Sequence, residues 1–166
     1  MSLRCAGWIR AGTRTAQAED GTVKPGGPDD NLVSRMQHAA RSGETFARRV
    51  FSGAGIYGVI VLLPMYFMEA AIGRDYPPPI THPEHFYGFV GVALTWQIVF
   101  LLIARDVRRY RLMMLPSILE KLTFGIPAWV LYATGRAPGS IAAAGSIDLL
   151  LGLLFVLAFL RTRQEG

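Results

Sequence analysis

Four long apolar runs occupy the last two-thirds of this 166-residue chain and limit what it can fold into. They are Val50–Ala71, Phe86–Ala104, Leu112–Ala133 and Ile141–Leu160. Each is close to the ~20 residues that a helix needs to cross the ~30 Å hydrocarbon core of a bilayer. Helices and closed barrels satisfy their backbone in lipid, and these runs lack the alternating pattern of barrel strands. The runs therefore predict an all-α fold, a four-helix transmembrane bundle.

The composition supports a membrane location and argues against a soluble one. Apolar residues make up 51% of the chain and charged residues 17%, although the net charge is +5. A nucleic-acid-binding protein would need its basic face on a soluble domain, and no such domain is predicted. We expect the lipid bilayer, and no nucleic acid, as a partner.

The arginines beside the runs predict the orientation, since cytoplasmic loops carry an excess of Lys and Arg. Cytoplasmic candidates are Arg35, Arg41, Arg48 and Arg49 before the first run, Arg105, Arg108, Arg109 and Arg111 between the second and third, and Arg161 and Arg163 at the end. The opposite side has Arg74 and Arg136. This predicts a multi-pass membrane protein with both termini cytoplasmic. The block at 105–111 is an interfacial anchor and a candidate site for anionic lipid.

Residues 1–46 differ from the rest and are expected to form a disordered, basic cytoplasmic tail. They contain the turn-rich run Pro25–Asp30 and few large apolar residues, too few to offset the entropy of ordering. Translation from Met36 is an alternative that would make the preceding segment a non-native extension. The single cysteine, Cys5, excludes an intramolecular disulfide. The transmembrane domain is expected to cover residues 47–163.

Asp148 is the most informative residue of the fourth run. Ala144, Gly145 and Gly152 lie three or four residues away, so these small residues share its helix face. This places Asp148 towards the bundle, where an ionisable residue indicates a functional site by default. There are two alternatives to a functional role. The carboxylate makes only a structural hydrogen bond to another helix, or the helix starts closer to Asp148 and leaves its carboxylate near water.

Glu120 and Lys121 allow two interpretations of the third run. If its helix begins at Ser117, then Ser117 and Glu120 form a capping box, and Lys121 extends to the cytoplasm. If the helix begins at Leu112, both charges lie about 12 Å inside the membrane and must be paired or neutralised. Pro116 favours the first interpretation.

The second run contains Thr95 and Gln97, which are candidates for polar packing or ligand contact together with Lys121. Gln97 is deep enough that its amide needs a partner on another helix. We expect it to have a structural role.

The connector between the first two runs contains most of the remaining candidate functional residues. His82, Glu84 and His85 could bind a divalent cation, and Glu69 precedes the connector. However, Thr81 and Glu84 match a capping box with Pro83 in the first helical turn. Because this assigns Glu84 a structural role, we expect no metal.

Several segments resemble a group of small bacterial four-helix membrane proteins without an assigned function. They are Val61–Phe67, Pro77–Pro79, His85–Phe89, Ile103–Asp106 and Leu119–Lys121. The resemblance covers residues 50–163 and implies a location in the bacterial inner membrane. In size and layout the chain is also distantly similar to the DoxX-like family, some members of which are accessory subunits of membrane redox enzymes; this implies no catalytic residue here.

We therefore expect a non-catalytic accessory or lipid- or quinone-binding subunit without a cofactor, within a larger membrane complex or a homodimer. One alternative is a small membrane enzyme acting on a lipid or isoprenoid, with Glu69, Glu120 or Asp148 as acid–base groups. Another is a cation-coupled transporter that functions as an oligomer.

Overall fold

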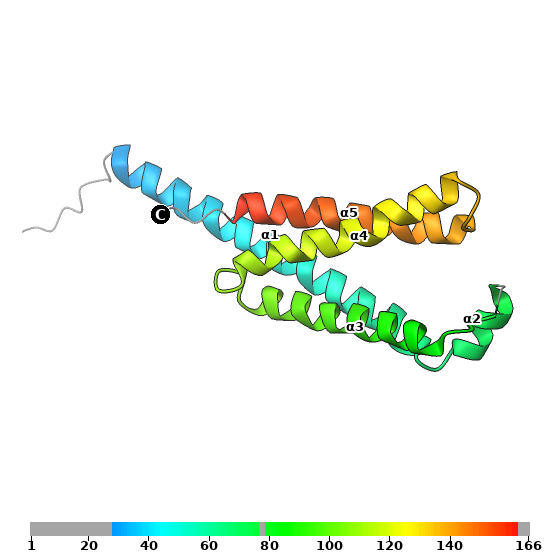
Figure 1. Cartoon of the computed structure of the whole chain (residues 1–166). Coiled ribbons are helices and arrows are strands. Elements are labelled where there is room, and N and C mark those ends of the chain that lie inside the picture. The colour runs from blue at the N-terminus through cyan, green and yellow to red at the C-terminus, as the bar shows by residue number, and fades with distance from the viewer. Residues whose placement is uncertain (1–27, 77–78, 163–166) are drawn as a thin grey trace, which may run out of the picture.

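The structure is a computed structural model that describes residues 28–76 and 79–162. Over these residues the chain is all-helical (Figure 1). The elements are α1 (Pro28–Met65), α2 (Glu69–Asp75), α3 (Pro83–Arg105), the 3-10 helix η1 (Arg111–Met113), α4 (Met114–Ala133) and α5 (Gly139–Arg161).

The four long helices form two hairpins. α1 packs along α3, and α4 packs along α5, while α1 also contacts α5 and so joins the two pairs. α3 and α4 make few contacts, and they diverge from η1 towards the end that holds α2 (Figure 1). We call this the α2 end, and the opposite end, with residues 105–111 and Arg161, the arginine end.

A cluster of phenylalanines joins α1, α3 and α5 near the arginine end. Phe51 stacks on Phe155 with ring centroids 4.1 Å apart, and Phe100 meets Phe155 edge to face at 5.0 Å. All three side chains are fully buried. Aromatic pairs in these arrangements stabilise packing beyond the area they bury. This cluster joins the two hairpins near the arginine end.

The first helix differs from the prediction at both ends. It is helical from Pro28, so the expected disorder of residues 28–46 is wrong, and the tail before Pro28 lies outside the described residues. It ends at Met65, and a turn then separates it from α2, so the predicted span over residues 50–71 is divided. Pro64 lies next to the end of the helix. At ~1.5 Å per residue α1 is longer than a bilayer is thick, and its first part extends beyond the other helices (Figure 1).

The described helices show the features of a membrane-embedded protein. Three of them are long and apolar enough to cross a bilayer: Asp30–Met65, Pro83–Arg105 and Gly139–Arg161. Their outward faces are apolar, with Ile60, Val92 and Leu150 67%, 63% and 58% exposed. Soluble proteins rarely expose apolar surface on this scale. α4, which contains Glu120 and Lys121, is not among the three.

Candidate functional site: a groove backed by a buried ionic cluster

The few contacts between α3 and α4 leave an apolar groove. It has a volume of about 640 Å³ and is lined from α3 by Gly88, Phe89, Val92, Ala93 and Trp96, and from α4 by Pro116, Leu119, Glu120, Thr123 and Phe124. A second groove of about 570 Å³ adjoins it along α3, with Gly88, Val92 and Trp96 in both walls. Among the described residues, Glu120 is the one ionisable residue that lines the first groove. An apolar groove with a single charged group suits a molecule with a long apolar part.

The start of α4 places Glu120 and its neighbour within the bundle. α4 begins at Met114, with η1 directly before it, so Glu120 is its seventh residue. The Ser117 hydroxyl donates to the Met113 carbonyl oxygen at 2.7 Å and does not cap a helix. The predicted capping box of Ser117 and Glu120 is therefore wrong. Pro116 is tolerated because the first N–H groups of a helix have no intrahelical partner.

Lys121 forms the centre of a buried ionic cluster. Its Nζ lies 3.1 Å from Oε2 of Glu120 and 3.3 Å from Oδ1 of Asp148 on α5. Only 6% of the Lys121 side chain is exposed, against 18% for Glu120 and 17% for Asp148. The ammonium also lies 5.2 Å from the centroid of the Phe100 ring, within range of a cation–π contact. The prediction that Lys121 extends to the cytoplasm is wrong.

Small residues bring α4 and α5 close enough for this contact. A Cβ added to Gly145 would lie 2.7 Å from Cβ of Ala128, and one added to Gly152 would lie 3.3 Å from Cβ of Lys121. The expectation that the face of Asp148 is closely packed against the bundle is confirmed, and the packing partner is α4. Asp148 is the tenth of 23 residues in α5 and Lys121 the eighth of 20 in α4, so the cluster lies well inside both helices.

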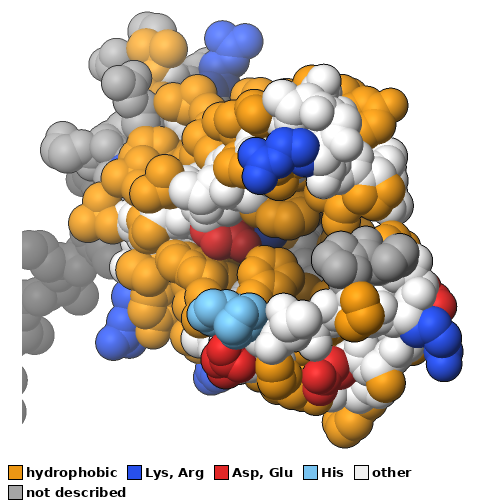
Figure 2. Space-filling model, turned by 45° about the vertical axis from the view of Figure 1, so that its right-hand side comes forward, with side chains coloured by type: hydrophobic (Ala, Val, Ile, Leu, Met, Phe, Trp, Pro, Cys, Tyr) orange, Lys and Arg blue, Asp and Glu red, His pale blue; other side chains and the backbone are white. Residues whose placement is uncertain are grey.

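Figure 2 shows acidic and basic side chains in a recess between hydrophobic surfaces. The cluster has two carboxylates for one ammonium. With all three groups ionised its net charge is −1, which is costly in a low-dielectric interior unless a proton or a cation is bound. The arrangement can hold a polar head group at the groove, or exchange a proton or cation.

Gln97 and Thr95 each donate a hydrogen bond within their own helix. Gln97 is buried, and its Nε2 donates to the Ala93 carbonyl oxygen at 2.9 Å, so the expected interhelical partner for this amide group is not observed among the described residues. Its side chain instead fills the space above Gly58 of α1, where an added Cβ would overlap it. The Thr95 hydroxyl donates to the Gly91 carbonyl oxygen at 2.9 Å, and Thr95 lines the second groove.

Glu69, the third candidate acid–base residue, belongs to another part of the molecule. It opens α2 and accepts a hydrogen bond of 2.7 Å from the Tyr87 hydroxyl of α3. This contact links α2 to the start of α3 at the α2 end. The structure brings Glu120 and Asp148 together around Lys121, and Glu69 is not part of that cluster.

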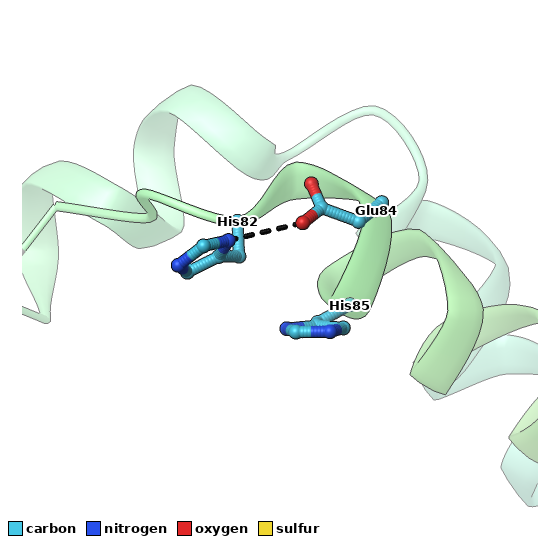
Figure 3. Close-up of side chains that lie close together, drawn as sticks. All are labelled: His82, Glu84 and His85. Atoms are coloured by element: carbon cyan, nitrogen blue, oxygen red, sulfur yellow. Dashed lines mark hydrogen bonds and ion pairs between the residues drawn. The ribbon is translucent and has the colours of Figure 1, made fainter.

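The histidine segment forms the start of α3 without the predicted cap. The residue before the helix is His82, not Thr81, and it makes no side-chain capping hydrogen bond. Glu84 instead pairs with His82, with 3.0 Å between Oε1 and Nδ1 (Figure 3). The capping box of Thr81 and Glu84 is therefore wrong, and so is the reason to discount these residues as ligands.

The four arginines of the proposed lipid anchor have different surroundings. Arg108 pairs with Glu44 of α1, and Arg111 donates to the Phe159 carbonyl oxygen at 3.1 Å while lying over the Phe159 ring. Arg111 thus fixes the connector before α4 against α5. Arg105 and Arg109 are exposed, so they are better placed than Arg111 to meet lipid head groups.

Comparisons with protein-family models, with curated proteins and with solved structures give no match to this chain. The groove and the ionic cluster are therefore interpreted from their own chemistry.

Proposed function

We propose that this protein is a non-catalytic, four-span membrane subunit that binds an amphiphile of the lipid, isoprenoid or quinone class. The apolar part of the ligand lies along the groove between α3 and α4, and its polar part lies near Glu120. The observation that carries the proposal is the apolar wall of the groove with Glu120 in it, directly in front of the Lys121–Asp148 pair. A ligand there would supply the surface that α3 and α4 do not bury against each other.

The proposal includes α4 as the fourth span. Its 20 residues cover about 30 Å, the thickness of the hydrocarbon core, and its two charges pair inside the bundle instead of facing lipid. The excess of arginines supports a cytoplasmic arginine end and an α2 end that faces outwards, and the resemblance noted in the sequence suggests a bacterial inner membrane. An accessory role in a larger complex agrees with the distant similarity in size and layout to DoxX-like proteins that the sequence suggests.

Filling the groove tests the proposal. Gly88 lines it, and an added Cβ would meet nothing within 4 Å, so Gly88→Leu places a side chain where the ligand should lie. We expect native mass spectrometry of the gently extracted wild-type protein to find one retained amphiphile per chain. In Gly88→Leu retention should fall about tenfold, which corresponds to about 1.4 kcal/mol of binding free energy.

The matched control is Gly53→Leu, a position in α1 that also has open space around it and does not line the groove. Both variants gain the same helix propensity, so only the location differs. Equal retention in both variants, or no stoichiometric amphiphile in the wild type, would contradict the proposal.

The ionic cluster favours a second function, proton- or cation-coupled chemistry or transport. Its excess carboxylate requires a proton or a cation, and Asp148→Asn removes one of the two acids while preserving the shape of the side chain. If this second function holds, Asp148→Asn abolishes proton flux through proteoliposomes read by an enclosed pH-sensitive dye, and retention of the amphiphile persists. Absence of flux in the wild type would remove the support for transport.

A further inference from the structure

His82, Glu84 and His85 gather at the start of α3, outside the groove and the ionic cluster. Each offers one ligand atom, and the three atoms lie within 4.8 Å of one another (Figure 3). Pro83 is the first residue of the helix, and Glu84 and His85 follow it in the first turn. The short spacing lets one helical turn present all three groups together.

We propose that these three residues bind a divalent transition-metal ion such as Zn²⁺. Imidazole nitrogens and a carboxylate oxygen are its usual ligands, and two histidines with one carboxylate leave a fourth position for water or another molecule. A tetrahedral site with Zn–N bonds of ~2.0–2.1 Å needs ligand atoms about 3.3 Å apart. Nδ1 of His82 and Oε1 of Glu84 are already 3.0 Å apart, so His85 makes most of the adjustment.

The three side chains can move into this geometry at little cost in free energy, because they are exposed. The side chains of His82 and Glu84 are 66% and 65% exposed, and the two imidazole rings have centroids 5.3 Å apart. No core packing restricts these side chains, because all three residues are exposed, and an ion can reach them from solvent.

The position at a helix N-terminus limits the affinity. The positive end of the α3 dipole opposes a cation, and the charge of Glu84 offsets part of this effect. We therefore expect a dissociation constant on the order of 10 µM instead of the tighter values of buried structural sites. The site is independent of the groove proposed above, because none of its three residues lines the groove.

The test is a Zn²⁺ and Co²⁺ titration of the full chain in detergent, purified without a histidine tag. A Cys5→Ser background removes the one thiol that could compete as a ligand. We expect one ion per chain, and for Co²⁺ the visible absorption of a four- or five-coordinate nitrogen–oxygen site. His82→Ala or His85→Ala should weaken binding at least tenfold, and Glu84→Gln should weaken it as well.

His38→Ala is the matched control, since His38 is the third histidine of the chain and is exposed on α1. It should leave the affinity unchanged. Circular dichroism establishes that each variant is folded. Wild-type affinity in the His82→Ala/His85→Ala double variant, or an equal loss in His38→Ala, would overturn the proposal.

Discussion

Replacing Lys121 by methionine is expected to lower the free energy of unfolding by about 3 kcal/mol, because breaking a buried ion pair leaves its charges uncompensated. Glu120 and Asp148 both lie within 3.3 Å of the Lys121 ammonium, and each is less than a fifth exposed. Without the lysine, the two carboxylates face each other in an apolar interior. The measurement is equilibrium unfolding in mixed detergent micelles, followed by circular dichroism.

A neutral version of the same cluster is the control. The triple variant Lys121→Met/Glu120→Gln/Asp148→Asn removes every charge and retains similar volumes, and replacing a buried ionic cluster as a whole is often nearly neutral. It should recover most of the lost stability. If Lys121→Met alone is as stable as the wild type, the ammonium reaches water instead, as expected for a helix that begins at Ser117.

The position of Asp148 was predictable from the sequence, and its partner was not. Small residues three and four positions away identify the packed face of α5 without reference to other helices. Lys121 depends on where α4 begins, and Pro116 fits the first turn of a helix that begins at Met114 as well as it fits a later start. The alternative with the earlier helix start, in which the two charges must be paired, is the one that agrees with the structure.

The early start of α1 did have a sequence signal. Pro28 followed by Asp29 and Asp30 is typical of a helix beginning, with proline first and acids in the first turn. The residues after it include the good helix formers Arg35 and Met36. These signals overlap the turn-rich run Pro25–Asp30, whose composition is also typical of a loop.

The pairing of the helices, which forms the groove, could not be read from the chain. In lipid a helix can be apolar on every side, so its sequence does not reveal which face meets a neighbour. The outward-facing Val92 and the buried Val90 of α3 are the same residue type. That α3 faces α4 across a groove instead of a packed interface follows only from three-dimensional packing.

Replacing Gly43 by alanine should be the most damaging single-methyl change, with a loss of about 2 kcal/mol in the free energy of unfolding, as typical for overpacking. A Cβ at Gly43 would overlap the backbone carbonyl of Arg161 at the end of α5. A backbone atom cannot rotate away as a side chain does, so α1 and α5 must separate. This contact lies beside the Arg161 guanidinium, which is 4.6 Å from the centroid of the Phe46 ring, and the separation would weaken that cation–π contact too.

Gly53→Ala in the same helix is the control, because its Cβ would meet nothing within 4 Å. Helix propensity favours alanine over glycine by about 1 kcal/mol at both positions, so the difference between the two variants isolates the contact with α5. We expect Gly53→Ala to match or exceed the wild-type stability in the same detergent unfolding experiment. Since α1 is the element that joins the two hairpins, a large loss in Gly43→Ala would place the junction of the bundle at this crossing. Equal stability of the two variants would mean that α1 and α5 do not approach this closely.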